Sequence, residues 1–196
     1  MARRLGLLVP DLVELELDPV LGAAEPDPEI QDLITGSAGS NLGVDFLPGS
    51  LPYTPGGPFT PDERLAADIV WLDALTTNVD RTPRNPNLLI WHDRLWLIDH
   101  GAALYLHHGG LNAEEHADRP FPLIADHVLL TRADSILDAH ARLAPAVDQP
   151  LLEEVASLVP AGWFGGEAPD VYVDYLNRRT RSGAFAGEAE RARTDA

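Results

Sequence analysis

The sequence predicts an α+β fold, in which a few short strands accompany a mostly helical second half. Apolar and acidic side chains alternate along residues 11–18, which is the period of a strand with one apolar face. Two apolar runs, residues 88–91 and 95–98, are separated by three polar residues, and this predicts a β-hairpin. The stretch after Thr60 and much of the chain after residue 106 repeat apolar residues at helical spacing.

The first sixty residues contain short elements and then a long loop. Residues 2–5 predict the last turn of a helix that begins before this chain, because no N-cap residue precedes them. Residues 11–18 predict a strand, residues 30–34 a short helix and residues 44–47 a second brief strand. Residues 48–61 contain five prolines and three glycines, so we expect a loop and a structural boundary there.

A long buried helix is expected to follow this loop. Thr60 is the predicted N-cap, Pro61 suits the first helical position and Glu63 completes a capping box. Its apolar stripe indicates burial and comprises Leu65, Ile69, Leu72 and Thr76.

Further helices are expected toward the C-terminus. Gly183 ends the clearest of them, and the charged, alanine-rich residues after it indicate a frayed end. The expected helical ranges are 122–131, 133–143, 149–159 and 169–182. We therefore expect three parts: residues 1–50, residues 51–182 and a flexible tail of residues 183–196.

The composition excludes several classes of chemistry. The formal charge is −17, all 14 basic residues are arginine, and the chain has no lysine and no cysteine. Disulfide frameworks, thiol nucleophiles, Schiff-base lysines and P-loop lysines are therefore excluded. Such an acidic chain does not offer the basic face that nucleic acids require, and no apolar run is long enough to cross a membrane. We expect a cytoplasmic protein without nucleic-acid or membrane partners.

The chemistry is expected at one end of the predicted hairpin. Asp80 and Asn85 precede the hairpin and Asp99 follows it, so folding the hairpin brings the three residues toward one end. Carboxylate and amide oxygens suit Mg²⁺, which commonly binds carboxylates together with substrate phosphates. Asp80 could orient a hydroxyl nucleophile, and Arg84 could contact phosphate.

Structural alternatives exist for each of these residues. Asp80 and Asn85 could cap the loop backbone, and Asn87 is more simply a cap than a ligand. Arg81 and Arg84 could pair with acidic neighbours, and for Arg81 this interpretation is the stronger one. A zinc or manganese hydrolase would instead use His100, His107 and His108, although their spacing matches no zinc motif.

The segment Asn78–Gly101 matches the spacing of the phosphoryl-transfer loops of protein kinases. A catalytic Asp is followed five residues later by a metal-binding Asn, and a hairpin then leads to Asp-x-Gly, here Asp99-His100-Gly101. This segment resembles the catalytic core of the HipA-like kinases, with a looser resemblance over residues 5–180.

The resemblance implies a protein-kinase-like fold with a mostly helical C-lobe and a remnant of the N-lobe sheet and hinge in residues 1–50. It implies ATP and Mg²⁺ as cofactors and transfer of phosphate to a hydroxyl of a protein substrate. Asp80 would be the catalytic base, helped by Arg84, while Asn85 and Asp99 would bind magnesium. The hinge strand, whose backbone would face the adenine, is Val44, Asp45, Phe46 and Leu47.

The chain departs from this family in its N-lobe. It contains no lysine to hold the α- and β-phosphates and no glycine-rich turn near its start, so we expect it to begin inside the small lobe. A partner chain could supply the missing N-lobe elements. The alternative function is a catalytically impaired, kinase-like binding or regulatory module that lacks the N-lobe lysine.

Overall fold

The computed structural model describes residues 1–105 and 112–196 and divides the chain into two compact units. Val9–Ser50 form the smaller one, here called the hairpin unit, and Met1–Leu8 with Leu51–Ala196 form the helical unit. Helices and short antiparallel strands make the fold α+β, as predicted. The first eight residues, which we expected to fold with the hairpin unit, group with the helical unit instead.

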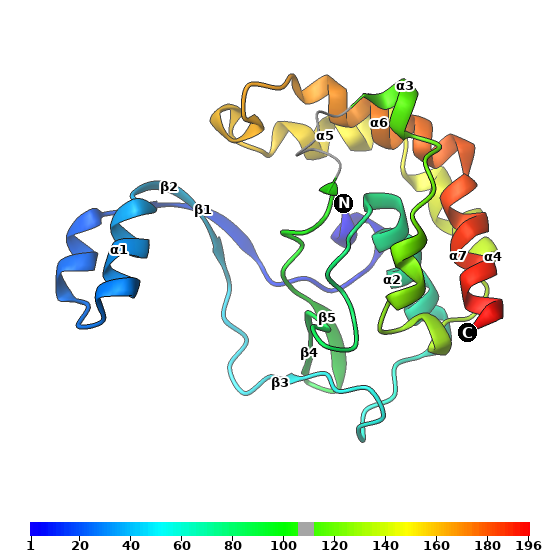
Figure 1. The fold of residues 1–196 in the computed structure, drawn as a ribbon, viewed down its shortest axis with the longest axis horizontal. Coiled ribbons are helices and arrows are strands. Elements are labelled where there is room, and N and C mark those ends of the chain that lie inside the picture. Colours follow the sequence, from blue (N-terminus) through cyan, green and yellow to red (C-terminus); the bar gives the residue numbers. More distant parts are fainter. Residues whose placement is uncertain (106–111) are drawn as a thin grey trace. The chain divides into compact units, whose positions relative to one another are not determined.

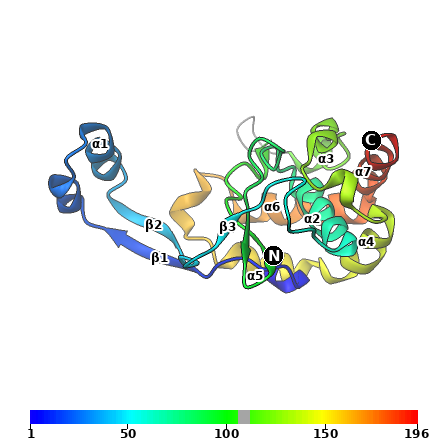
Figure 2. The same cartoon turned by 90° about the horizontal axis from the view of Figure 1, so that it is seen from below.

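The hairpin unit is built on two antiparallel strands. β1 (Leu12–Leu17) pairs with β2 (Gly39–Val44), from Leu12 opposite Val44 to Leu17 opposite Gly39. Figure 1 and Figure 2 both show the two strands side by side. The predicted strand at residues 11–18 is confirmed.

Two short helices connect these strands. η2 (Pro19–Ala24) and α1 (Pro28–Gly36) each begin with proline after an aspartate whose side chain accepts a backbone N–H at 2.9 Å, from Val20 and Glu29 respectively. A Cβ on Gly22 would lie 2.8 Å from Thr35 Oγ1, so glycine permits the close approach of η2 to α1. The helix predicted at residues 30–34 is present and is longer than expected.

The strand predicted at residues 44–47 is wrong except at its first residue. β2 ends at Val44, and its other members, residues 39–43, were not predicted to form a strand. Cross-strand pairing with β1 stabilises this stretch as a strand despite its two glycines, because strand formation depends on packing more than on intrinsic preference.

A three-stranded antiparallel sheet belongs to the helical unit, in the order β3 (Leu51–Pro52), β4 (Leu88–Trp91), β5 (Arg94–Leu97). The turn residues His92 and Asp93 have φ of 49° and 56°, the left-handed values of a type I′ hairpin. The predicted hairpin is thereby confirmed.

The helix α2 (Glu63–Thr76) is the core of the helical unit. Ten of its residues are buried, and it contacts α4, α6 and α7. Burial confirms the prediction, but the predicted start is wrong. Asp62, not Thr60, is the N-cap, and its side chain accepts the N–H of Leu65 at 3.0 Å. Aspartate caps at least as well as threonine, so the helix begins after Pro61.

The remaining helices differ from the predicted ranges in several places. Residues 122–131 form two 3₁₀ turns, because His127 is extended between them and its side chain binds Asp73. The short α3 was not predicted. The elements are α3 (Ala113–His116), η4 (Pro122–Asp126), η5 (Leu130–Arg132), α4 (Ile136–Leu143), η6 (Ala144–Ala146), α5 (Gln149–Ser157), η7 (Ala161–Phe164) and α6 (Pro169–Ser182), with η1 (Ala2–Leu5) at the start.

The expected frayed tail is instead a helix, α7 (Ala184–Asp195). Gly183 ends α6 with φ of 64°, as predicted, and serves as the N-cap residue of α7. Phe185, Ala186 and Ala189 are buried, and α7 contacts α2 and α4. Tertiary packing thus stabilises a segment whose charge suggested disorder. No described helix is long and apolar enough to cross a membrane.

Candidate functional site

The loop between α2 and β4 brings two of the predicted site residues into contact. Asn85 Nδ2 donates to Asp80 Oδ2 at 2.6 Å, and Asn87 Nδ2 donates to the same oxygen at 3.1 Å. A tight turn brings these side chains together. In this turn the Thr82 N–H donates to the carbonyl of Asn85 at 3.2 Å, and the Asn85 N–H donates to the carbonyl of Thr82 at 3.1 Å. Asp80 Oδ2 therefore accepts hydrogen bonds from two side-chain amides of its own loop.

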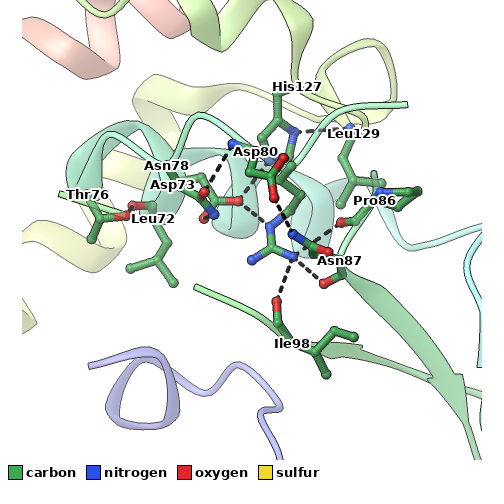
Figure 3. A network of polar contacts seen from close by, with 11 residues as sticks. Leu72, Asp73, Thr76, Asn78, Asp80, Pro86, Asn87, Ile98, His127 and Leu129 are labelled. Atoms are coloured by element: carbon green, nitrogen blue, oxygen red, sulfur yellow. Dashed lines mark hydrogen bonds and ion pairs between the residues drawn. The ribbon is translucent and has the colours of Figure 1, made fainter. Parts of the chain in front are cut away.

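Arg81 anchors this loop from the interior. Its side chain is fully buried, and its Nε donates to Asp73 Oδ2 at 2.6 Å. Its Nη1 donates to the carbonyl oxygens of Pro86, Asn87 and Ile98, three residues that Figure 3 labels within this network. The ion pairing that we favoured for Arg81 is confirmed. One guanidinium therefore joins α2, the loop before β4 and the segment after β5.

Asp73 is the centre of this network. It is fully buried on α2, and Asn78 Nδ2 donates to its Oδ1 at 3.0 Å. His127 Nδ1 accepts the N–H of Leu129 at 3.1 Å, so the neutral ring carries its proton on Nε2 and donates it to Asp73 Oδ2 at 3.0 Å. Burial alone would raise the pKa of Asp73, but Arg81, His127 and Asn78 together hold it well below its usual value.

Asp99 lies just after β5 and directly follows Ile98, whose carbonyl oxygen accepts from Arg81. Ile98 donates its N–H to the carbonyl of Asn87 at 3.1 Å, and its own carbonyl lies 3.5 Å from Arg81 Nη1. Asp99 is exposed, and its Oδ1 accepts the N–H of Gly101 at 3.1 Å. The segment that carries Asp99 is thus bonded directly to the loop that carries Asp80 and Asn85.

Backbone strain gathers in the same region. Thr77, Asn87, Asp99 and Leu104 have φ between 47° and 57°, a left-handed conformation that residues other than glycine adopt infrequently. Asparagine and aspartate tolerate it well, whereas threonine and leucine do so at a cost. Leu104 is held by its N–H, which donates to the carbonyl of Thr76 at 2.6 Å. Such outliers tend to cluster at functional sites.

The remaining predicted residues have simpler surroundings. Arg84 is exposed on the tight turn and makes no ion pair with the described residues. In the hairpin unit, the N–H of Asp45 donates to the carbonyl of Asp11 at 2.7 Å, the Phe46 side chain is 80% exposed and Leu47 is buried. The Asp45 N–H is therefore already engaged. The adenine role of Val44–Leu47 stays a prediction from the resemblance.

His100 is partly buried beside the site. Burial and the charge of Arg81 lower its pKa, while Asp73 and Asp99 oppose that shift. Among the described residues, neither His100 Nε2 nor Arg81 Nη2 has a hydrogen-bond partner. His107 and His108 lie outside the described residues. In the part of the chain that is described, no three His, Cys, Asp or Glu side chains gather as a metal site.

Sequence reasoning missed the buried supports Asp73 and His127. Asp73 lies one position after Leu72 on a helix whose next three residues are also buried. A carboxylate within such a run is rare without a buried partner, so this was an available signal. His127 had none, because nothing local indicates that it reaches α2.

Comparisons of the chain with protein-family models, with curated proteins and with solved structures found no match.

Proposed function

We propose that this chain is a HipA-like kinase that transfers phosphate from ATP to a hydroxyl of a protein, with Mg²⁺ as cofactor. The observation that supports this best is the anchoring by Arg81. One buried guanidinium binds the carbonyls of Asn87 and Ile98 and so holds together the two segments that carry Asp80, Asn85 and Asp99. Phosphoryl transfer depends largely on such positioning.

The proposed catalytic base is Asp80. The two amides on Oδ2 orient its carboxylate, and the side chain is only partly buried, so a substrate hydroxyl can reach it. There it would accept the hydroxyl proton as the new O–P bond forms and the bond from the γ-phosphorus to the bridging oxygen breaks. ADP leaves with that bridging oxygen.

The donor set fits magnesium. Asn85 and Asp99 are exposed and offer one amide oxygen and one carboxylate, which are hard ligands suited to an ion that also binds phosphate. When bound, Mg²⁺ supplies positive charge against the triphosphate. Arg84, exposed on the same turn as Asn85, would add a second positive charge there. These two positive charges would offset the repulsion between the triphosphate and a chain with a formal charge of −17.

The absence of lysine favours a second candidate, a kinase-like module that binds a partner or nucleotide without catalysis. Without the strand lysine, no residue of the kinase template is left to grip the α- and β-phosphates. The two candidates differ in one step, because only the first transfers phosphate.

Two measurements test the proposal. ATP is expected to raise the melting temperature only when Mg²⁺ is present, and Asp99→Ala is expected to abolish the shift, whereas Asp195→Ala, an exposed acid on α7, should keep it. Incubation with radiolabelled ATP should then label the chain or a protein substrate, and Asp80→Asn should not label. Binding without labelling would favour the regulatory module. A folded protein with no shift at millimolar ATP would contradict both nucleotide-binding proposals.

A further inference from the structure

The hairpin unit has almost no core of its own. Only Pro10, Gly22 and Leu47 are buried among Val9–Ser50. Two-stranded hairpins are at best marginally stable in water, and clustered exposed apolar side chains usually mark an interaction site. The large apolar residues that it exposes are Leu12, Val13, Leu15, Val20, Leu21, Ile30, Leu33, Leu42, Val44 and Phe46.

Both faces of the two-stranded sheet are exposed. On one face, Val13 and Leu15 lean across Gly43, where an added Cβ would lie 2.6 Å from Leu15 Cδ2. Val13 is 56% exposed there, and Leu42 is 55% exposed on the opposite face. Glu14 and Glu16 alternate with the apolar residues of β1 and share the face of Leu42. β1 therefore has one apolar face and one mixed, acidic face.

The charge of the hairpin unit restricts what can cover it. Val9–Ser50 contain nine acidic residues and no arginine, lysine or histidine, a formal charge of −9. The rest of the chain carries the remaining −8 of the total −17. A second copy or the helical unit would each bring like charge to this surface, whereas a basic partner would bring complementary charge.

The outer edge of β1 is where such a partner fits best. Among the described residues, β1 pairs only with β2, so one of its edges has no neighbouring strand. An unpaired edge is a template for an added strand. β1 carries Glu14 and Glu16, whereas β2 has no charged residue, so the acidic edge is that of β1.

We propose that β1 binds an extended, basic segment of another protein as a third strand. Apolar side chains of that segment would pack beside Val13, Leu15 and Leu17, and its alternating Lys or Arg side chains would lie beside Glu14 and Glu16. Specificity comes from this alternation, since a shift by one residue would place the basic groups on the apolar face. This surface is separate from the residues proposed for phosphoryl transfer and does not depend on that activity.

The test uses the full chain and a short amidated peptide in which lysine and valine alternate. Two control peptides are a glutamate–valine version and a lysine–valine version with proline in place of the central valine, which keeps the charge but cannot complete a strand. Fluorescence anisotropy measures binding, and hydrogen exchange locates it. We expect the lysine–valine peptide to bind, both controls to bind at least about tenfold more weakly, and protection to fall on Leu12–Leu17.

Two double charge-reversal variants distinguish binding at this surface from nonspecific electrostatic attraction to the acidic chain. Glu14→Lys with Glu16→Lys is expected to weaken binding about tenfold or more, whereas Glu167→Lys with Asp195→Lys in the helical unit changes the charge equally and should weaken it less than about threefold. Equal weakening, tight binding of the proline peptide, protection confined to the helical unit, or no binding at millimolar peptide would each overturn the proposal. So would dimer formation when salt screens the charges, because a second copy would then cover the surface.

Discussion

Arg81 and Arg179 are both buried in the helical unit, but their guanidinium groups bind different partners. Arg81 pairs with the buried carboxylate of Asp73 and binds carbonyls around the candidate site. Arg179 is 1% exposed and has no carboxylate within ion-pair distance among the described residues. It donates to four carbonyls, those of Ala74, Leu75, Ala117 and Arg119, at 2.9–3.1 Å.

The different partners of the two arginines indicate a different structural role for each. Ala74 and Leu75 lie in the last turn of α2, whose carbonyls lack helical partners and carry partial negative charge, so Arg179 serves as a C-terminal cap. Its guanidinium also lies 5.2 Å from the centre of the Phe185 ring, which ties α6 to α7. Arg179 therefore supports helix packing, whereas Arg81 positions loops. Replacing Arg81 should therefore destabilise the loops, and replacing Arg179 should destabilise the helix packing.

The largest effect is expected from Arg81→Met. It keeps most of the side-chain volume but strands the buried charge of Asp73, and breaking a buried pair in this way costs about 3–5 kcal/mol. Urea denaturation measures the loss. Hydrogen exchange should show early loss of protection at the Ile98 and Val128 amides, which bond to Asn87 and to Arg81 itself. A loss below about 1 kcal/mol would contradict the central role of this pair.

Arg179→Met is expected to cost less, about 2–3 kcal/mol, because it leaves carbonyls unsatisfied but strands no charge. The same denaturation experiment measures it. Exchange should accelerate at the end of α2 and in α6, while the Ile98 amide keeps its protection. If Arg179→Met lowered the exchange protection of the Ile98 amide as strongly as Arg81→Met does, the two arginines would belong to one cooperative network. They would then not have separate structural roles.

Acid should weaken the Arg81 network and spare the Arg179 cap. The pKa of Asp73 is lower in the folded protein than in the unfolded chain, so its stabilisation is complete above the unfolded pKa of about 4 and is lost as the pH falls toward the folded value. A loss on the order of 2 kcal/mol is expected from this group. Denaturation of the wild type and Asp73→Asn between pH 6 and about 2 measures it, and the variant should show a flatter profile. Parallel profiles would contradict the assignment.

Local signals predicted the elements that local chemistry determines. The hairpin at residues 88–98 follows from apolar runs around a polar turn, and α6 begins and ends at Pro169 and Ser182 as its apolar spacing and Gly183 indicated. The predictions failed where distant contacts decide. His127 interrupts a predicted helix to reach Asp73, and Phe185 buries a segment that composition described as frayed.

The candidate site divides in the same way. The spacing of Asp80 and Asn85 around the loop predicted that they lie close together, and the structure shows them in contact. The buried residues that support this loop could not be predicted from the sequence of the loop itself. Asp73 lies on α2, and His127 lies 54 residues after Asp73 in the chain. The sequence thus indicated candidate reactive groups, and only the fold shows what positions them.

The smallest effect on stability is expected at the surface of the site, from Asn85→Ala. This residue is exposed and donates one hydrogen bond to Asp80, so the free energy of unfolding should fall by no more than about 1 kcal/mol. If Arg81 rather than this contact orders the loop, Ile98 should keep its exchange protection while the Mg²⁺-dependent response to ATP disappears. Thr82→Ala, on the same turn, is the matched control and should keep that response. A variant Asn85→Ala that loses stability as severely as Arg81→Met would show that the loop orders itself, and the buried arginine would then be a consequence of the site rather than its support.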